Sequence, residues 1–177
     1  MEKNKLKKIT FSGVFLSLGL ILPIFTMQIK EIGDTLLPMH IPVLLCGILC
    51  GAPWGAAVGF ILPFLRSLLF SMPPIYPNAC WMAVELAVYG ISIGFIYNKL
   101  KFGKVINIYI SLISAQILGR VAWGVAKSLL LMGTANAFSL SVFFIGGFVD
   151  AFLGIVLQWV IIPAIVVILK KFQGGNK

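Results

Sequence analysis

Charged side chains are scarce in this chain of 177 residues. Only 11% of the residues are charged, with five acidic residues in all, whereas 60% are hydrophobic. Ordinary soluble domains carry about 25% charged residues. This shortage of polar surface excludes an ordinary water-soluble domain, and we interpret the chain as an integral membrane protein. Its length fits one domain, residues 1–177.

Residues that carry catalysis are equally few. His40 is the single histidine, and the three cysteines, Cys46, Cys50 and Cys80, are too few for a disulfide framework. No carboxylate lies near Cys46 and Cys50 to complete a metal site. Neither an H-E-x-x-H motif nor a P-loop occurs, so the chain cannot hydrolyse ATP alone. We expect a protein that is not an enzyme and that needs no metal or cofactor.

Long hydrophobic runs, in contrast, fill most of the chain. Six apolar segments follow one another: Ile9–Ile29, Leu36–Gly51, Pro53–Phe70, Asn78–Tyr97, Val105–Met132 and Val142–Leu169. A membrane-spanning helix needs about 17–25 residues. The second segment is shorter and carries Pro38 and Pro42, so it is short enough to enter as a half-span. We predict an all-α bundle of six transmembrane helices.

Basic residues lie beside the ends of these segments on one side of the predicted bundle. Four lysines fall in residues 3–8, three in residues 99–104 and three in residues 170–177. Loops rich in Lys and Arg stay in the cytoplasm. We therefore predict a multi-pass protein of the cell membrane with both termini in the cytoplasm. On this interpretation the net charge of +9 reflects topology and not nucleic-acid binding.

The connections on the opposite side are more elaborate than the tight inward connection at Cys50–Pro53, and we expect binding from outside. They cover residues 30–35, 71–77 and 133–141. The middle connection is stiffened by three prolines, and its Tyr76 is amphipathic. We predict that this segment acts as a lid or as an anchor at the membrane interface.

Small residues recur at the spacing that lets helices approach closely. Gly51, Gly55 and Gly59 open the third segment, and the pairs Gly90–Gly94 and Gly147–Ala151 repeat the pattern. We expect these to pack within the chain. The pair Gly13–Ser17 lies in the first segment, which holds no interior charge, so we assign its face to a protein partner.

Five ionisable side chains lie inside the apolar segments: Arg66, Glu85, Arg120, Lys127 and Asp150. An ionised group in hydrocarbon costs at least about 2.5 kcal/mol, so each needs a partner, water or a ligand. We take these residues as markers of the functional site.

Helical spacing groups these charges with other polar and aromatic residues on shared faces. The three predicted stripes are Asn78, Trp81, Glu85 and Tyr89; Gln116, Arg120, Trp123 and Lys127; and Gly147, Asp150, Gly154 and Gln158. Such one-sided stripes are expected to face the bundle interior. Trp81 and Trp123 would supply apolar walls of a small-molecule pocket. The predicted substrate-binding residues are Glu85, Arg120, Asp150, Lys127, Asn78, Trp81, Trp123, Tyr89, Arg66 and, at the mouth of the second segment, His40.

Pairing between helices is the alternative interpretation of the same charges. Glu85 and Asp150 could each pair with one of the three cations, which leaves one positive charge over. A ligand carboxylate would neutralise it. Lys127 could instead extend to the outer surface, and a lone histidine such as His40 is more often a hydrogen-bonding residue at a helix end. Both interpretations stay open at this stage.

The segment Leu37–Tyr97 carries a resemblance to a known family. It begins L-P-M-H-I-P-V-L-L-C-G-I-L-C-G-A-P-W-G-A-A-V-G-F-I-L-P-F-L-R-S-L-L-F and continues through M-P-P to M-A-V-E-L-A-V-Y-G. It resembles the substrate-binding S components of energy-coupling factor (ECF) vitamin importers. The resemblance implies a high-affinity vitamin-binding subunit with an outward pocket. Its implied partners are a transmembrane coupling subunit and two cytoplasmic ATPases.

The resemblance also implies a partner face and a ligand. In the family the first helix commonly presents small residues to the coupling subunit, and the matching positions here are Gly13 and Ser17. The M-P-P and E-L-x-x-Y-G stretches look most like the pantothenate-type branch. Riboflavin, a pyridoxine-like vitamin and a queuosine precursor remain alternatives. A stand-alone secondary transporter or channel is the alternative from another class.

Overall fold

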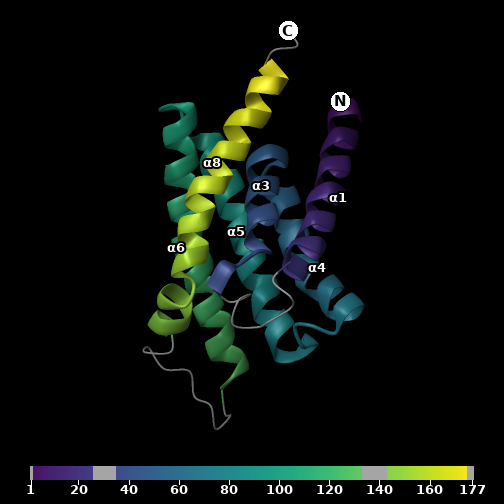
Figure 1. Ribbon diagram of the computed structural model, residues 1–177, viewed down its shortest axis with the longest axis vertical. Coiled ribbons are helices and arrows are strands. Elements are labelled where there is room, and N and C mark those ends of the chain that lie inside the picture. Colours follow the sequence, from purple (N-terminus) through teal and green to yellow (C-terminus); the bar gives the residue numbers. More distant parts are fainter. Residues whose placement is uncertain (1, 26–34, 133–142, 175–177) are drawn as a thin grey trace.

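A computed structural model describes residues 2–25, 35–132 and 143–174, and these parts are helical with no β-strand among them. The helices are α1 (Glu2–Phe25), α3 (His40–Cys50), α4 (Ala52–Phe70), α5 (Cys80–Lys99), α6 (Lys104–Leu130) and α8 (Phe152–Gly174). The turn η1 (Ile75–Ala79), in which Tyr76 has extended backbone, precedes α5, and the π-helical turn η2 (Ile145–Val149) precedes α8. Figure 1 shows that the start of α1 and the end of α8 lie at the same end of the bundle.

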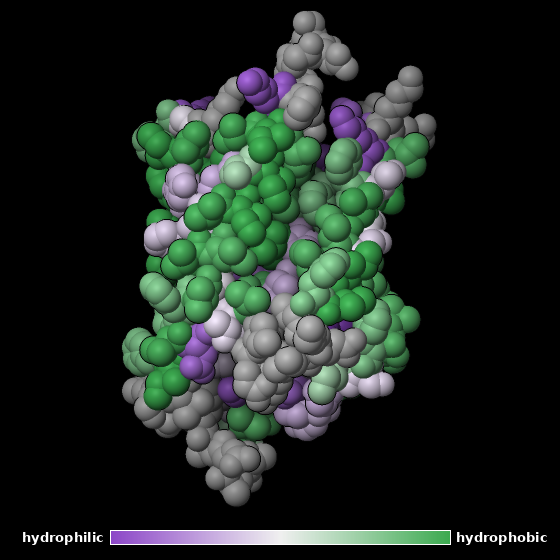
Figure 2. All heavy atoms as spheres, in the orientation of Figure 1, coloured by the Kyte–Doolittle hydropathy of each residue, from purple (hydrophilic) through white to green (hydrophobic). Residues whose placement is uncertain are grey.

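Five stretches of the described residues are long and apolar enough to cross a membrane: Asn4–Phe25, Ala52–Phe70, Ile75–Lys99, Val105–Leu130 and Ile145–Lys171. Their outer faces are apolar, with Phe60 52% and Val160 66% exposed. Figure 2 shows hydrophobic side chains over the middle of the face in view. An apolar exterior of this kind fits lipid as the surrounding solvent. The chain is a multi-pass membrane protein.

The second predicted segment forms the 11-residue helix α3, five residues shorter than Leu36–Gly51. The backbone of Leu37 has a positive φ of 50°, which stops the helix from starting there. Pro42 falls in the first turn, where its missing N–H costs no helical hydrogen bond. All residues of α3 except Leu49 are buried, as expected of a helix that is apolar on every side. The start of α3 therefore lies inside the bundle.

Glycines bring α3, α4 and α5 into backbone contact. A Cβ atom at Gly55 would lie 2.8 Å from the Cα of Gly47, and one at Gly90 would lie 2.2 Å from the carbonyl carbon of Gly55. Gly59 and Gly94 are equally crowded by backbone atoms. The prediction that small residues pack closely within the chain is confirmed for these four glycines, whereas Gly51, with a φ of 101° and nothing within 4 Å of an added Cβ, ends α3 instead. Together α3, α4 and α5 form a tightly packed unit, the glycine platform, which fixes the positions of the α5 side chains.

Candidate functional site

Glu85 lies at the centre of a buried charged cluster. Its Oε1 accepts a hydrogen bond from Arg120 Nη1 at 3.0 Å and lies 3.3 Å from His40 Nε2. The three side chains come from α5, α6 and α3, and each is at most 3% exposed. We call His40, Glu85 and Arg120 the central cluster. All three were predicted from the sequence as site residues. The structure therefore brings this part of the predicted set together.

Local backbone features place each member of the central cluster. The turn after Leu37 starts α3, since the backbone N–H of His40 donates to the Leu37 carbonyl at 3.0 Å. This makes His40 the first residue of a buried helix and aims its ring at α5. On α6, Gly119 lets the Tyr89 ring approach so closely that a Cβ atom would lie 2.3 Å from Tyr89 Cε2. The close contact of α5 with α6 allows Arg120 to reach Glu85.

Tyr89 packs against the central cluster. Its ring meets the His40 ring edge-on, with centroids 4.9 Å apart and an interplanar angle of 87°. Its hydroxyl donates to the Gln116 carbonyl at 3.5 Å, and only 1% of the residue is exposed. Tyr89, predicted as a substrate contact, thus packs against His40 and holds that ring in place.

A second polar group ties α6 to α8 beside the cluster. Gln116 Nε2 donates to Gln158 Oε1 at 3.1 Å, and Trp159 Nε1 donates to Gln116 Oε1 at 2.8 Å. Both glutamines are buried, as their stripes predicted. Sequence reasoning left Gln116 and Gln158 out of the predicted site although they stood in the stripes, and it missed Trp159, whose neighbours give no polar signal.

Several buried nitrogens of these groups have no hydrogen-bond partner among the described residues. They are Arg120 Nε, Arg120 Nη2, His40 Nδ1 and Gln158 Nε2. Nε and Nη2 form one edge of the guanidinium, the pair of parallel donors that binds a carboxylate side-on. Arg120 therefore has one nitrogen committed to Glu85 and a complete donor edge in reserve. In the tautomer that donates from Nε2, His40 Nδ1 is available to accept a hydrogen bond from a ligand hydroxyl.

Lys127 lies between the two tryptophans that were predicted to form pocket walls. Its Nζ is 4.6 Å from the centroid of the Trp123 ring and 5.4 Å from that of Trp81. Trp81 comes from α5, and Trp123 and Lys127 come from α6, two turns apart at most from Arg120. Both aromatic faces are thus directed at a cation, an arrangement that stabilises the ammonium group inside an apolar region.

Arg66 lies outside the central cluster. It is buried near the end of α4, and its Nε donates to the Met72 carbonyl at 3.1 Å. This bond fastens the segment 71–77 to α4. Within that segment Tyr76 is 67% exposed, in keeping with an anchor or lid position. The described part of the chain places no carboxylate within ion-pair distance of Arg66, and its role as a substrate contact stays a prediction.

Asp150 does not face the bundle interior, and that part of the third predicted stripe is wrong. Asp150 is exposed, whereas Gly147, Gly154 and Gln158 of the same stripe are buried. The cause is η2, where the Asp150 N–H donates to the Ile145 carbonyl at 2.9 Å. A π-helical turn holds more residues than an α-helical one, so positions counted at α-helical spacing rotate off the buried face. Asn78 lies half-buried in η1, and its predicted contact stays untested.

The predicted partner face on α1 is open. Gly13 and Ser17 are both exposed, and a Cβ atom at Gly13 would meet nothing within 4 Å. The Ser17 hydroxyl donates to the Gly13 carbonyl at 3.0 Å, so its polar group is satisfied within the helix. The surface between them is therefore small and apolar, which suits close helix packing.

Two further patterns in the chain do not form a catalytic or metal site among the described residues. Gly90–Gly94 reads G-x-S-x-G, but it lies inside α5 and not at a strand-to-helix turn, and Ser92 Oγ donates to the Val88 carbonyl at 2.6 Å. This geometry does not expose a nucleophile. Across the described ranges, His, Cys, Asp and Glu side chains nowhere gather in a group of three that could hold a metal ion. The buried Cys46 contacts Ser12 Oγ at 3.6 Å and packs in the core.

Comparison with known proteins identifies a family. The model of the family described as the ECF transporter, substrate-specific component, matches residues 7–169. Searches among curated proteins and among solved structures give no match. The matched range runs from α1 to α8 and includes the central cluster and the tryptophan pair.

Proposed function

The chain belongs to the family of ECF transporter substrate-specific components, and from this membership we propose that it captures pantothenate from outside the cell for ATP-driven uptake. The family is one of substrate-binding transport subunits and not of enzymes. Pantothenate carries one carboxylate and two hydroxyl groups, which is the chemistry that the central cluster can satisfy.

The free donor edge of Arg120 carries this proposal. Arg120 is 3% exposed, and two nitrogens of its guanidinium have no partner among the described residues, so they need acceptor atoms from outside these residues. A ligand carboxylate supplies two oxygens at the spacing of Nε and Nη2. Glu85 holds Arg120 in place through Nη1, so it orients the arginine without competing for that edge.

The remaining groups fit the rest of such a ligand. His40 Nδ1 and Gln158 Nε2 offer one acceptor and one donor for hydroxyl or amide groups. Trp81 and Trp123 would contribute apolar surface for the carbon skeleton beside Lys127, whose ammonium group lies over one face of each ring. Riboflavin, a pyridoxine-like vitamin and a queuosine precursor are the alternative ligands.

We place the entrance at the end of the bundle opposite the termini, under the segment 71–77. The lysines at the start of α1 and at the end of α8 support a cytoplasmic location of the termini by the positive-inside rule. The hydrogen bond from Arg66 Nε to the Met72 carbonyl fixes the start of this segment. The amphipathic side chain of Tyr76 is exposed near its end. Closure of this segment would shield the bound ligand from water.

A transmembrane coupling subunit and two cytoplasmic ATPases are the proposed partners. The open face around Gly13 and Ser17 supports α1 as the contact with the coupling subunit, because small residues allow two helices to approach closely. The chain itself has no P-loop, so energy must come from the partners.

Mass spectrometry of small molecules that co-purify with the detergent-solubilised chain tests the proposal. We expect a carboxylate-bearing vitamin, with pantothenate first, in the wild-type sample. A matched sample of the Arg120→Lys variant should contain less of it, because Lys keeps the charge but lacks the two-donor edge. ATP-independent uptake by the chain alone in liposomes would contradict the proposal and favour a stand-alone transporter.

A further inference from the structure

The end of the bundle that we assign to the cytoplasm holds a cavity, and its lining residues on α5 and α6 lie at least 12 residues along the chain from Glu85 and Arg120. It has a volume of about 260 Å³ and is lined by Tyr97, Val105, Ile108, Val166, Val167, Lys170 and Lys171. We propose that this cavity binds an anionic phospholipid, with the phosphate at the two lysines and an acyl chain along the valines and Ile108. The inference does not depend on which vitamin the chain carries.

The depth of the cavity matches the headgroup level of a bilayer. Three candidate spans have ends here: Ile75–Lys99 ends two residues after Tyr97, Val105–Leu130 begins at a lining residue, and Ile145–Lys171 ends at another. Residues at the ends of spans lie where acyl chains give way to headgroups. A cavity at this level can contact both the phosphate of a lipid and the part of its acyl chain nearest the headgroup.

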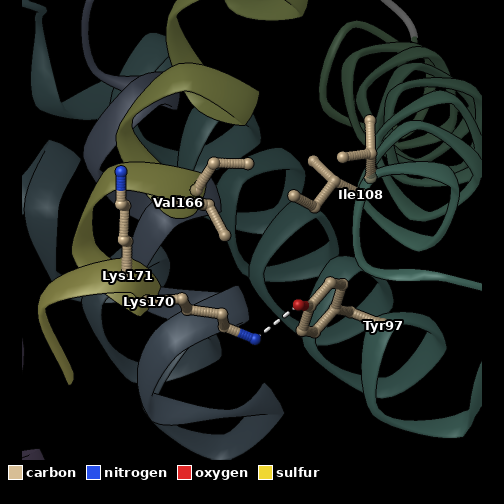
Figure 3. A pocket seen from close by; sticks show the side chains of 7 residues that line it. Tyr97, Ile108, Val166, Lys170 and Lys171 are labelled. Atoms are coloured by element: carbon tan, nitrogen blue, oxygen red, sulfur yellow. Dashed lines mark hydrogen bonds between the residues drawn. The ribbon is translucent and has the colours of Figure 1, made fainter. Parts of the chain in front are cut away.

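The polar rim is arranged for an anion. Lys170 Nζ donates to the Tyr97 hydroxyl and lies 4.3 Å from the centroid of that ring. Figure 3 shows this contact reaching across from α8 to α5. An ammonium group has three donors, so two remain for phosphate oxygens, and the Tyr97 hydroxyl keeps its own proton to donate. Lys171 is exposed beside them.

The wall of the cavity is aliphatic and partly open to the membrane. Ile108 and Val166 line the cavity from opposite sides and are buried, whereas Val105 is 49% and Val167 is 44% exposed. Figure 3 shows Ile108 and Val166 facing each other across the cavity. A free phosphate would leave this apolar surface uncovered, whereas a lipid covers it and pairs with the lysines at the same time. The occupant that fits both halves is therefore a phospholipid.

The surrounding charge favours an anionic lipid over a zwitterionic one. No acidic residue occurs in residues 86–149 or 151–177, which include every residue that lines the cavity, and the basic residues of the lining are Lys170 and Lys171. Basic pockets between membrane helices on the cytoplasmic side bind anionic headgroups, with about 1 kcal/mol for each Lys near the surface. That value corresponds to about a fivefold preference for each lysine.

Native mass spectrometry of the full chain released from bilayer nanodiscs tests the site. The nanodiscs contain equal amounts of phosphatidylglycerol and phosphatidylcholine. We expect the wild-type chain to retain phosphatidylglycerol preferentially, and Lys170→Gln or Lys171→Gln to lower that preference about fivefold. The matched control is Lys99→Gln, because Lys99 lies on the same side but contacts Phe95, 4.2 Å from its Nζ, and does not line the cavity.

A second variant separates occupancy of the groove from surface charge. Val167→Trp fills the cavity from its exposed side, and we expect it to lower retention of both lipids without a change in thermal unfolding. The proposal is overturned if the wild-type chain retains both lipids equally, or if Lys99→Gln has the effect of Lys170→Gln. It is also overturned if Lys170→Gln leaves the lipid ratio unchanged and instead lowers recovery of the coupling subunit, which would assign the groove to a protein.

Discussion

Arg120 donates to Glu85 through Nη1 at 3.0 Å while its Nε and Nη2 find no partner among the described residues. One carboxylate thus holds the arginine, and the opposite edge of the same guanidinium stays available. Structural pairing and ligand binding were alternative interpretations of the charges inside the apolar segments. In this geometry a single residue can do both, because a guanidinium has five donors in a rigid plane.

Removing either partner of the buried pair should destabilise the protein more than removing both. Glu85→Leu leaves a buried guanidinium without its carboxylate, which typically costs about 3–5 kcal/mol. The double variant Glu85→Leu with Arg120→Leu should recover a large part of this loss. Thermal unfolding in detergent, without ligand, measures the effect. Additive losses in the double variant would show that the two residues do not stabilise each other.

The glycine platform gives a prediction with a built-in control. Gly55→Ala places a Cβ atom 2.8 Å from Gly47 Cα and 2.9 Å from the Gly90 carbonyl oxygen, so α3, α4 and α5 must separate. Overpacking of this kind costs about 1–3 kcal/mol. Gly13→Ala meets nothing within 4 Å and, at an exposed helical position, should keep or slightly raise the unfolding temperature. Equal unfolding temperatures for the two variants would contradict the packing described for α3, α4 and α5.

The exposed face of α1 should matter only when the partner is present. Gly13→Leu adds bulk to a surface that touches nothing in the chain itself. We expect lower co-purification with the coupling subunit and lower ATP-dependent uptake, with unchanged ligand affinity of the isolated chain. Val14→Leu, on a neighbouring exposed position of α1, serves as the control. Weaker ligand binding by Gly13→Leu would place its effect in the fold and not at the interface.

The bond between Arg66 and the segment 71–77 should influence ligand exchange. Arg66→Met removes the donor that lies 3.1 Å from the Met72 carbonyl oxygen but keeps a long side chain at this position of α4. If the segment is a lid, its looser base should raise the rate of ligand dissociation several-fold, with a smaller change in thermal stability. Stopped-flow or filter-binding measurements give the rate. An unchanged dissociation rate would remove the lid function from this segment.

Sequence periodicity was sufficient for the features that depend on the 3.6-residue repeat. It placed Glu85, Arg120, Gln116 and Gln158 on interior faces, and it identified the glycines that bring helices together. It failed at Asp150, because η2 changes the repeat just where that residue lies. The periodicity of a segment carries no sign of a π-helical turn that is set by packing.

Contacts between segments were beyond sequence reasoning for a different reason. The pairing of His40 with Glu85 depends on where α3 begins, and that start is fixed by the positive φ of Leu37 and the turn after it. Lys127 between Trp81 and Trp123 depends likewise on the relative rotation of α5 and α6. One sequence shows which residue types lie on each face, but the facing partner is decided by how the helices pack.

The most direct test of the central claim compares pantothenate with panthenol, in which an alcohol replaces the carboxylate. Isothermal titration calorimetry measures both ligands against the wild-type chain and the Arg120→Lys variant. Two hydrogen bonds to a charged group are worth about 3 kcal/mol or more together, so the wild-type chain should prefer the acid by at least about 100-fold. The variant should lose most of this preference. Equal affinities of the wild-type chain for the two ligands, or a preference that survives in Arg120→Lys, would contradict the account.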